Sequence, residues 1–553
     1  MLPLGIKEGS VLRNTASAAR HRNRGPGGAD GRSFRDGVPV TGDGRRRERA
    51  VRYGIEQADE PDILQGYHRQ TPSSPNASSI RASRVIRCDI RHGEHNMQRQ
   101  DRRQFLRLTG LAAAGVMLPC HSRGSEASPA KPNMILFLGD DHSAWDAGCY
   151  GNKVVRTPNL DRLASEGMRF NRAFTATAMC APSRSMLYTG LFPHRNGCHM
   201  NHGATHAGVQ SLPHFLKPLG YRVVLAGKTH IKPETVYPFE YIRQEDIDTV
   251  IPGNAPFCLV IASNEPHSPH KQGGYSTAEV PIPPYLPDTP ATRLELAGYY
   301  TDIDTLDREL GRVMDLLKRS GKQDNTLFIY AGDHGNGLMA KWTCYEAGLR
   351  VPFVARWPAR IRAGSITEAM VSFVDVLPTF LEAAGSKRPK DIDGKSFLGV
   401  LTGEKKEHRK LIFGTHTNQG IISGEPYPVR SVRDTRYKYL RNLNPNGRPT
   451  NVATFGTDHT EMTAGLWAEW KARAMTDADT ARLLARVMNR PGEELYDLVN
   501  DPWELKNLAS EPSLAKKKAR LYRELDHWMR QQGDRGMVGE LEVRPHESMR
   551  AAQ

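Results

Sequence analysis

Two groups of metal-ligating side chains follow short apolar runs in this chain of 553 residues. Asp140 and Asp141 follow one run after a glycine, and Asp333 and His334 follow another after an alanine and a glycine. Two neighbouring buried carboxylates repel each other unless a cation or a proton lies between them. Three hard oxygen donors suit Ca²⁺ or Mg²⁺ better than a soft transition metal. Taken alone, an Asp-Asp pair after a strand is more often a helix cap or a turn.

Side chains that can bind or attack an anion occur at three other places. Cys180 precedes Arg184 by four residues, and one helical turn would direct both side chains to the same anion. Lys228 and His230 lie two residues apart and offer an ammonium and an imidazole to one ligand. His267 lies in a turn between prolines. In most proteins a Lys and a His with this spacing are simply solvated surface, and a lone His in a turn has no function.

The elements that must position these residues are short strands. Four apolar runs predict them, each ending in polar residues: 134–138, 221–226, 257–261 and 326–330. Nearly continuous apolar strands are typical of a parallel sheet covered on both faces. Ligands bind at the carboxyl ends of the strands in such sheets, where all four polar groups would emerge.

Helices are predicted between the strands. Apolar residues from Leu296 to Leu317 recur at spacings of three and four, and another helix is expected near Pro158. Alternating strands and helices predict an α/β sandwich over residues 131–390. Residues 391–540 predict a smaller α+β domain, and residues 541–553 a disordered tail.

Cys180-Ala181-Pro182-Ser183-Arg184 resembles the C-x-P-S-R signature of the type I sulfatases. Further motifs of that family follow in the same order: Gly227-Lys228-Thr229-His230, Pro266-His267 and the stretch Lys341–Pro352. The resemblance covers residues 132–508, and Tyr188 departs from it, because the signature usually has a smaller apolar residue there. It implies an alkaline phosphatase-like sandwich with a mixed, mostly parallel central sheet and a smaller C-terminal α+β domain.

The resemblance also implies the roles of the site residues. Cys180 would be oxidised to formylglycine by a formylglycine-generating enzyme, a partner that acts on the unfolded chain. The implied catalytic residues are Cys180, Arg184, Lys228, His230, His267 and Lys341. The implied ligands of one Ca²⁺ are Asp140, Asp141, Asp333, His334 and the modified Cys180. Glu346 and Arg350 are expected to brace the following strand.

A subgroup is suggested by segments outside these motifs. Residues 233–239, 287–293 and 429–433 are similar to the heparan N-sulfatases, which have Asn at the place of His334 and Arg near the place of Lys341. The expected function is hydrolysis of a sulfated glycan, with N-sulfoglucosamine sulfohydrolase activity favoured. The alternatives are an O-sulfatase acting on another sulfated polysaccharide, a phosphodiesterase or phosphonate monoester hydrolase of the same superfamily, and a glycan-binding protein with unmodified Cys180.

The formal net charge of +15 is unevenly distributed along the chain. Residues 1–96 carry a net +6 and residues 97–120 a net +3, which leaves +6 for the rest. No basic helix or stacking motif accompanies this excess, so no nucleic-acid partner is expected. No apolar run is long enough to span a bilayer.

Residues 1–96 are rich in Arg, Gly and Ser, and we expect them to be disordered or not translated. From Met97 the sequence has the shape of a twin-arginine signal followed by a short apolar stretch. We therefore expect translation to begin at Met97 and residues 97–130 to form a signal peptide and linker. The protein would then be exported to the periplasm or beyond by the twin-arginine machinery. The alternative is an arginine pair before a short core helix.

Seven cysteines occur, and Cys88 and Cys120 fall in segments expected to be absent from the mature protein. Four others show neither C-x-x-C pairing nor zinc-like spacing: Cys149, Cys198, Cys258 and Cys344. Buried free thiols are the expectation for these four.

Overall fold

The computed structural model describes residues 131–418, 426–449 and 461–542. The predictions for residues 1–96, 97–130 and most of the tail, and for Cys88 and Cys120, concern positions outside the described residues. In the part of the chain that is described, every cysteine is a free thiol, and all are buried as expected except Cys149, which is half-buried. None of the helices there combines the length and the apolar character needed to cross a membrane.

The largest sheet has eight strands, and β9 runs antiparallel to both of its neighbours while the other pairs are parallel. The predicted mixed, mostly parallel sheet is confirmed. In spatial order the strands are β10 (Ser365–Thr367), β2 (Met168–Phe170), β9 (Phe353–Arg356), β7 (Thr326–Gly332), β1 (Asn133–Gly139), β6 (Phe257–Ala262), β4 (Arg222–Gly227) and β5 (Glu240–Ile242).

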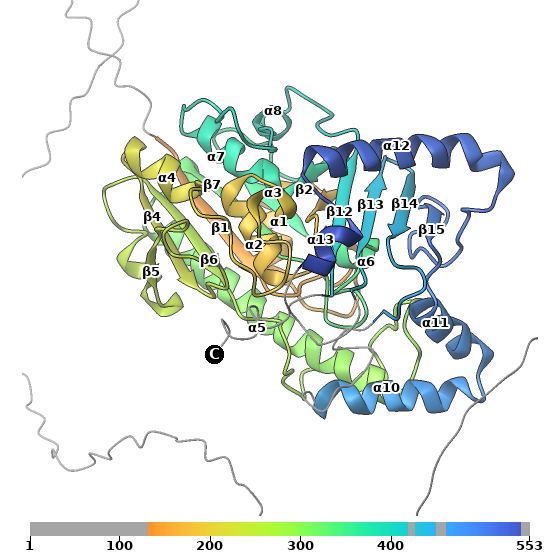
Figure 1. The fold of residues 1–553 in the computed structure, drawn as a ribbon. Coiled ribbons are helices and arrows are strands. Elements are labelled where there is room, and N and C mark those ends of the chain that lie inside the picture. Colours follow the sequence, from red (N-terminus) through yellow and green to blue (C-terminus); the bar gives the residue numbers. More distant parts are fainter. Residues whose placement is uncertain (1–130, 419–425, 450–460, 543–553) are drawn as a thin grey trace, which may run out of the picture. The chain divides into compact units, whose positions relative to one another are not determined.

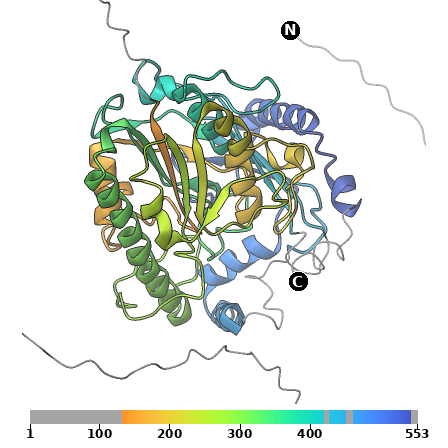
Figure 2. The same cartoon turned by 90° about the vertical axis from the view of Figure 1, so that its left-hand side faces the viewer.

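Both faces of this sheet are buried, as the apolar runs predict (Figure 2). In β1, Met134 and Leu136 belong to the core on one face, and Ile135 and Phe137 to the core on the other. The first face is covered by α2 (Cys180–Thr189), α4 (Leu212–Leu216) and α7 (Val376–Ala383), and the second by α1 (Pro158–Glu166) and α5 (Pro290–Arg319).

Helix α5 begins and ends as its sequence predicts. Thr289 caps it by accepting a hydrogen bond from the Thr292 backbone N–H, and Pro290 occupies the first helical position. The Asp307 carboxylate of α5 accepts hydrogen bonds from the backbone N–H groups of Asn159 (3.0 Å) and Leu160 (2.9 Å). A carboxylate at the first turn of α1 therefore fixes α1 against α5.

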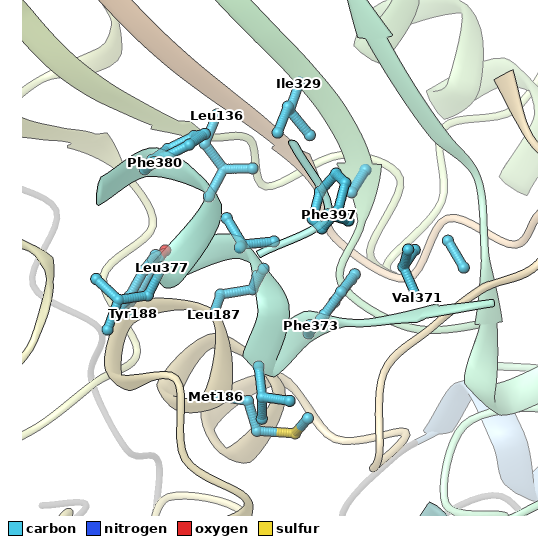
Figure 3. Close-up of a cluster of buried hydrophobic side chains, with 14 of the residues drawn as sticks. Leu136, Met186, Leu187, Tyr188, Ile329, Val371, Phe373, Leu377, Phe380 and Phe397 are labelled. Atoms are coloured by element: carbon cyan, nitrogen blue, oxygen red, sulfur yellow. The ribbon is translucent and has the colours of Figure 1, made fainter. Parts of the chain in front are cut away.

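Figure 3 shows how α2 is held on the sheet. Leu187 and Tyr188 of α2 lie in the same apolar cluster as Leu377 of α7 and Leu136 of β1. Tyr188 is fully buried, with its ring 5.4 Å from the edge-on ring of Phe239. The larger side chain at this position thus fills the core beside the last turn of α2.

The C-terminal part forms a second, antiparallel sheet of four strands, so the predicted smaller domain is confirmed. Helix α12 (Ala515–Gln531) runs across this sheet (Figure 1). Its strands are β12 (Ile412–His416), β13 (Val429–Arg433), β14 (Tyr437–Asn442) and β15 (Glu493–Asp497).

A small three-stranded sheet, β11 (Val371–Ser372), β3 (Ala173–Phe174) and β8 (Arg350–Val351), completes the strands of the described part. Further helices are α3 (Pro193–Asn196), α6 (Glu346–Leu349), α8 (Leu398–Leu401), α10 (Glu461–Ala474), α11 (Ala478–Met488) and α13 (Met537–Glu542). Short 3₁₀ helices span Gly148–Tyr150, Lys217–Leu219, Gln244–Thr249, Gln323–Asn325, Phe373–Asp375 and Pro512–Leu514.

Buried ion pairs join the C-terminal sheet to the start of α6. Glu346 lies between Arg433 (2.5 Å) and Lys438 (3.1 Å), and Lys438 also contacts Glu504 at 3.3 Å. All four side chains are almost fully buried, so removing one would leave a buried charge unpaired. Glu346 is therefore structural, as expected, but it braces β13 and β14 rather than the strand that follows it.

Candidate active site

Three carboxylates meet where β1 and β7 end. These strands are parallel neighbours with Gly139 opposite Gly332, so the residues that follow them are adjacent. The backbone N–H of Asp141 donates to Asp333 Oδ1 at 2.9 Å. Asp140, Asp141 and Asp333 are buried, and each offers an oxygen within 4.8 Å of the other two. This arrangement is a suitable oxygen-donor set for a divalent cation.

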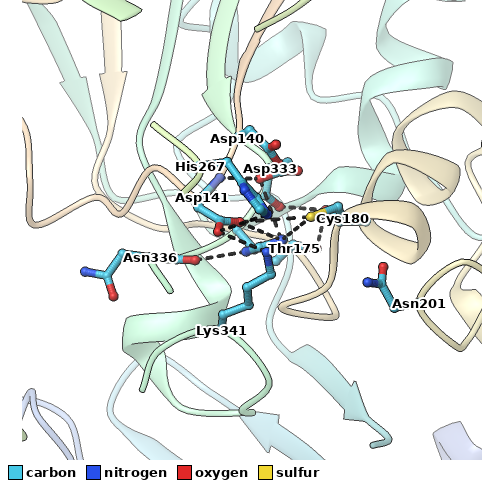
Figure 4. A network of polar contacts seen from close by, with 12 residues as sticks. Asp140, Asp141, Thr175, Cys180, Asn201, His267, Asp333, Asn336 and Lys341 are labelled. Carbon is cyan, nitrogen blue, oxygen red and sulfur yellow. Dashed lines mark hydrogen bonds and ion pairs between the residues drawn. The ribbon is translucent and has the colours of Figure 1, made fainter. Parts of the chain in front are cut away.

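Cys180 and His334 complete the centre of the site (Figure 4). Cys180 is the first residue of α2, and its Sγ lies 3.2 Å from His334 Nε2 and 4.0 Å from Asp141 Oδ1. His334 Nδ1 donates to the Gly335 carbonyl at 2.9 Å, which directs Nε2 toward the sulfur and the carboxylates. The cysteine side chain is therefore enclosed beside the candidate metal site.

The first turn of α2 is tied to the end of β7 by hydroxyl groups. Ser183 Oγ donates to the Asp333 carbonyl at 2.6 Å and lies 2.9 Å from Thr175 Oγ1. On the other side, the Ala181 backbone N–H donates to Asn201 Oδ1 at 3.4 Å. These bonds hold Cys180 in position relative to the carboxylates.

Arg184 is placed differently from the sequence prediction. Its guanidinium is fully buried and contacts Asp140 (3.3 Å) and Asp333 (3.0 Å). The expectation was that it would face the substrate anion beside Cys180. Because two carboxylates lie on the same side of α2, the guanidinium binds them instead and orients them.

Two lysines lie on the open side of the carboxylates. Lys341 Nζ is 2.9 Å from Asp141 Oδ2, and Lys228 contacts Asp140. Burial would lower the pKa of Lys341, but Asp141 and the other acids raise it above its usual value, so the side chain is charged. Three carboxylates and three basic groups, including Arg184, balance the charge of the cluster.

The carboxyl groups of the site titrate differently. Burial opposes ionisation of Asp140, but Arg184, Lys228 and Lys341 hold its pKa well below the usual value. Burial raises the pKa of Asp333 despite nearby His334 and Arg184. Burial also raises the pKa of Cys180 well above that of an ordinary thiol.

Histidines line the solvent side of the site. His267 Nε2 lies 3.9 Å from Asp141 Oδ2, and its Nδ1 donates to the Ser268 carbonyl at 2.6 Å. His230 Nε2 lies 2.8 Å from His202 Nδ1. Burial, with His202 and Lys228 beside it, lowers the pKa of His230 to about 3, so its ring is neutral near pH 7.

The structure thus brings every residue predicted for the site into one place, with Arg184 behind the carboxylates rather than facing outward. Sequence reasoning missed Asn201 and His202, which approach the site from the loop after α3. No strand-end pattern precedes that loop, so only its unusual number of histidines distinguished it.

Asp146 is a buried acid behind the carboxylate cluster, with Tyr300 Oη at 3.2 Å and Asn336 Nδ2 at 3.3 Å as donors. Burial raises its pKa to about 6 although these hydrogen bonds oppose the shift. A carboxyl with a higher pKa in the folded state stabilises the fold at low pH, and this contribution is lost as the pH rises through about 6. Asp146→Asn mimics the protonated form, so we expect it to raise the free energy of unfolding at pH 7.5 by about 1–3 kcal/mol.

Urea unfolding at pH 7.5 and pH 4 measures this difference. At pH 4 the gain from Asp146→Asn should largely disappear, because the wild-type carboxyl is protonated in the folded state. The exposed Asp248→Asn is the control and should show no such pH dependence. Equal effects of Asp146→Asn at both pH values would show that the ionised Asp146 carboxylate does not lower the free energy of unfolding.

Two families match the sequence. The sulfatase family matches residues 132–254 and 244–386, and the family of the N-sulphoglucosamine sulphohydrolase C-terminal region matches residues 332–464. An ulvan-active sulfatase of Formosa agariphila is 40% identical over 437 residues, covering 74% of this chain and 82% of that protein. Human N-sulphoglucosamine sulphohydrolase is 29% identical over 466 residues, covering 72% of this chain and 90% of that protein.

Solved structures share the fold. A chain solved in complex with its substrate D-glucosamine-2-N,6-O-disulfate has a TM-score of 0.57 at 21% identity, over 73% of this chain and 99% of that one. The phosphonate monoester hydrolase of Agrobacterium radiobacter has a TM-score of 0.57 at 19% identity, over 72% of this chain and 96% of that one. At these identities the likeness concerns the fold alone.

The α/β sandwich has the alkaline phosphatase-like fold that these solved structures share, and the cluster around Cys180 lies at the carboxyl edge of its sheet. The chain belongs to the sulfatase family. The resemblance to the sulfatases found in the sequence is thereby confirmed.

Proposed function

We propose that this protein hydrolyses sulfate esters of a sulfated polysaccharide through residue 180. The observation that carries the proposal is the position of Cys180 Sγ, 3.2 Å from His334 Nε2 and 4.0 Å from Asp141 Oδ1. Three buried carboxylates and Lys341 surround this sulfur (Figure 4), and Lys228 contacts one of these carboxylates, Asp140. A sulfate group attacked at residue 180 would lie between the positively charged lysines and the candidate metal site.

The thiol of Cys180 is not itself a suitable nucleophile. The thiolate is the reactive form, and burial raises the pKa of this thiol well above its usual value. We propose that a formylglycine-generating enzyme converts Cys180 before the chain folds. The aldehyde hydrate of the converted residue then supplies an oxygen nucleophile at this position.

The donor set fits Ca²⁺. The oxygen atoms of Asp140, Asp141 and Asp333 lie within 4.8 Å of one another, and carboxylates are the ligands that Ca²⁺ prefers. These residues would hold the ion, with His334 and the modified residue 180 beside it. When bound, the ion supplies positive charge next to the nucleophile and the sulfate oxygens. Since the side-chain charges of the cluster already balance, the added cation leaves a net positive charge that a singly charged sulfate ester would partly offset.

The remaining side chains bind the sulfate group and move protons. Lys228 and Lys341 carry fixed positive charges for the non-bridging sulfate oxygens. His267 is more than one-third exposed, so its Nε2 reaches the side on which the leaving group departs and can donate a proton to it. Once the first hydroxyl of the hydrate carries the sulfate group, the neutral ring of His230 can accept the proton of the second hydroxyl. The hydrate then returns to the aldehyde and sulfate is released.

A sulfate ester of a polysaccharide is the first candidate substrate, because the relative that acts on ulvan is 40% identical over 437 residues. Hydrolysis of an N-sulfated glucosamine is the second candidate. It is favoured by the match of residues 332–464 to the N-sulphoglucosamine sulphohydrolase C-terminal family and by the 29% identity to the human enzyme. We further propose that the protein is exported to the periplasm or beyond, where such polysaccharides occur.

A substrate panel tests the proposal. The purified enzyme would be incubated with ulvan oligosaccharides, O-sulfated and N-sulfated glucosamine, and an aryl phosphodiester, and the released sulfate or phosphate measured. We expect sulfate release from an O-sulfated sugar to be fastest, at least about tenfold above the phosphodiester. Release from N-sulfated glucosamine alone would support the second candidate, whereas faster phosphodiester cleavage would contradict both.

A further inference from the structure

A second arginine-rich hollow lies at the junction of the two large sheets. Its volume is about 430 Å³, and its walls include Arg169, Arg172, Arg350 and Arg433 with the aromatic rings of Trp145 and Tyr150. Arg169 lies in β2, Arg350 in β8 and Arg433 in β13, so three different sheets contribute guanidinium groups. None of these residues belongs to the site around Cys180.

Three buried N–H donors in this hollow have no acceptor among the described residues. They are Nε of Arg169, Nε of Arg350 and Nε1 of Trp145. Buried donors are normally paired, and leaving one unpaired has a cost in free energy. Three such donors on the walls of one hollow show that its polar side chains are not fully satisfied by the described part of the protein.

The charges of the hollow lead to the same conclusion. Arg433 is neutralised by Glu346 at 2.5 Å and Arg172 by Glu368 at 3.1 Å. Neither Arg169 nor Arg350 has a carboxylate within 4.0 Å in the described part of the chain. The walls of the hollow thus carry four arginines against two glutamates, and two of the guanidinium groups have no directly paired carboxylate.

Arg350 begins β8 and is half-buried. Its burial lowers its pKa, although Glu346 partly offsets this effect. An uncompensated charge in such a place is unfavourable unless an anion joins it.

Aromatic rings hold the two unpaired guanidinium groups in place. Arg350 lies over the Trp145 ring at 4.5 Å and Arg169 over the Tyr150 ring at 5.2 Å. A guanidinium fixed on a ring presents its edge N–H groups in one direction, which suits bidentate binding of a planar or tetrahedral oxyanion. The rings thus hold the two guanidinium groups in a fixed orientation without covering the edges of the groups.

We propose that this hollow is a second oxyanion-binding site, which takes a sulfate or carboxylate group through Arg169, Arg350 and Trp145. The oxyanion is either free sulfate or a charged group of the glycan, and only the second source depends on the proposed function. Trp145 follows the candidate metal ligand Asp141 by four residues, so the same loop contributes to both sites.

Calorimetric titration with inorganic sulfate tests this site without any turnover. We expect the wild-type protein to bind sulfate in this hollow and Arg169→Met to weaken that binding about tenfold or more, since a charge-assisted hydrogen bond is lost. Arg169→Met should leave turnover of a small aryl sulfate unchanged. Arg162→Met, which removes an arginine paired with Asp315 elsewhere on the protein, is the matched control and should bind sulfate as the wild type does.

Arg350→Met should have the same effect as Arg169→Met, and if it fails to fold, Arg169→Met alone decides. Titrations with glucosamine 6-sulfate and with glucuronic acid distinguish the sources. Binding of either sugar that Arg169→Met weakens assigns the site to the glycan, and binding of sulfate alone assigns it to the free anion. Unchanged sulfate stoichiometry and affinity in Arg169→Met would overturn the proposal, and so would wild-type protein that binds none of the three. Neither result depends on whether the protein is a sulfatase.

Discussion

Replacing Cys180 with alanine is expected to lower the rate of sulfate-ester hydrolysis by about 10⁴-fold or more. The lysines and carboxylates around residue 180 remain in this variant, but they stabilise charge and cannot replace a nucleophile. The fold should be retained, because alanine favours the helical conformation at the start of α2 and the side chain that it replaces is small. Steady-state rates on an aryl sulfate, together with circular dichroism of both proteins, measure the two parts of this result.

Cys258→Ala is the matched control for this variant. Cys258 is also a fully buried free thiol, but it lies within β6 in the apolar core. This control should keep most of the activity. Wild-type turnover by Cys180→Ala would refute the assignment of the nucleophile, and mass spectrometry of the wild-type peptide provides an independent check. In that peptide, the carbon that bears the thiol in cysteine should be an aldehyde carbon.

Asp141→Asn is expected to abolish most of the stabilisation by calcium and to lower turnover by about 10³-fold. The Asp141 carboxylate lies 2.9 Å from Lys341 Nζ and 3.3 Å from His334 Nε2, and it is buried beside the other two acids. The amide has the same shape but removes one negative charge and one oxygen donor from the proposed site. A ligand at 100 times its dissociation constant stabilises a protein by about 2.7 kcal/mol, so the loss is measurable as a change in melting temperature.

Asp315→Asn serves as the control, because this acid is about half exposed on α5. It should show the wild-type rise in melting temperature when calcium is added. If Asp141→Asn shows that rise as well, the three carboxylates do not form the metal site. The proposals for the nucleophile and for the metal thus fail or succeed separately.

The strands that carry the site were predictable from sequence because each is a nearly continuous apolar run. β1, β4, β6 and β7 are buried on both faces, and their polar ends contrast sharply with the runs before them. Adjacency of Asp140 and Asp333 then follows from parallel pairing of β1 and β7. Neither inference requires knowledge of the loops.

The edges of the large sheet were not predictable in the same way. β2 and β10 have three residues each, too few for a periodic signal. β9 has the apolar character of the parallel strands of the same sheet, so nothing in its residues indicates that it runs in the opposite direction. Strand direction there depends on the connections, which sequence patterns do not reveal.

Arg184 shows the limit of spacing arguments for the site. Four residues on a helix place two side chains on one face, and this part of the prediction agrees with the structure. Spacing does not tell which partner a long side chain reaches, and two buried carboxylates attract the guanidinium more strongly than open solvent does. His202 was missed because no spacing pattern marks it: its approach to His230 depends on loop geometry alone.

The enclosure of Cys180 has a consequence for how the protein is made. Its side chain is 1% exposed and every residue of α2 is buried, so no second protein can reach the sulfur once folding is complete. If the proposed conversion of Cys180 is required for activity, a chain that folds first would remain folded but inactive. The specific activity of a preparation would therefore depend on how fast residue 180 is converted relative to folding in the host. Rapid overproduction would lower the specific activity, because more chains would fold with Cys180 unmodified.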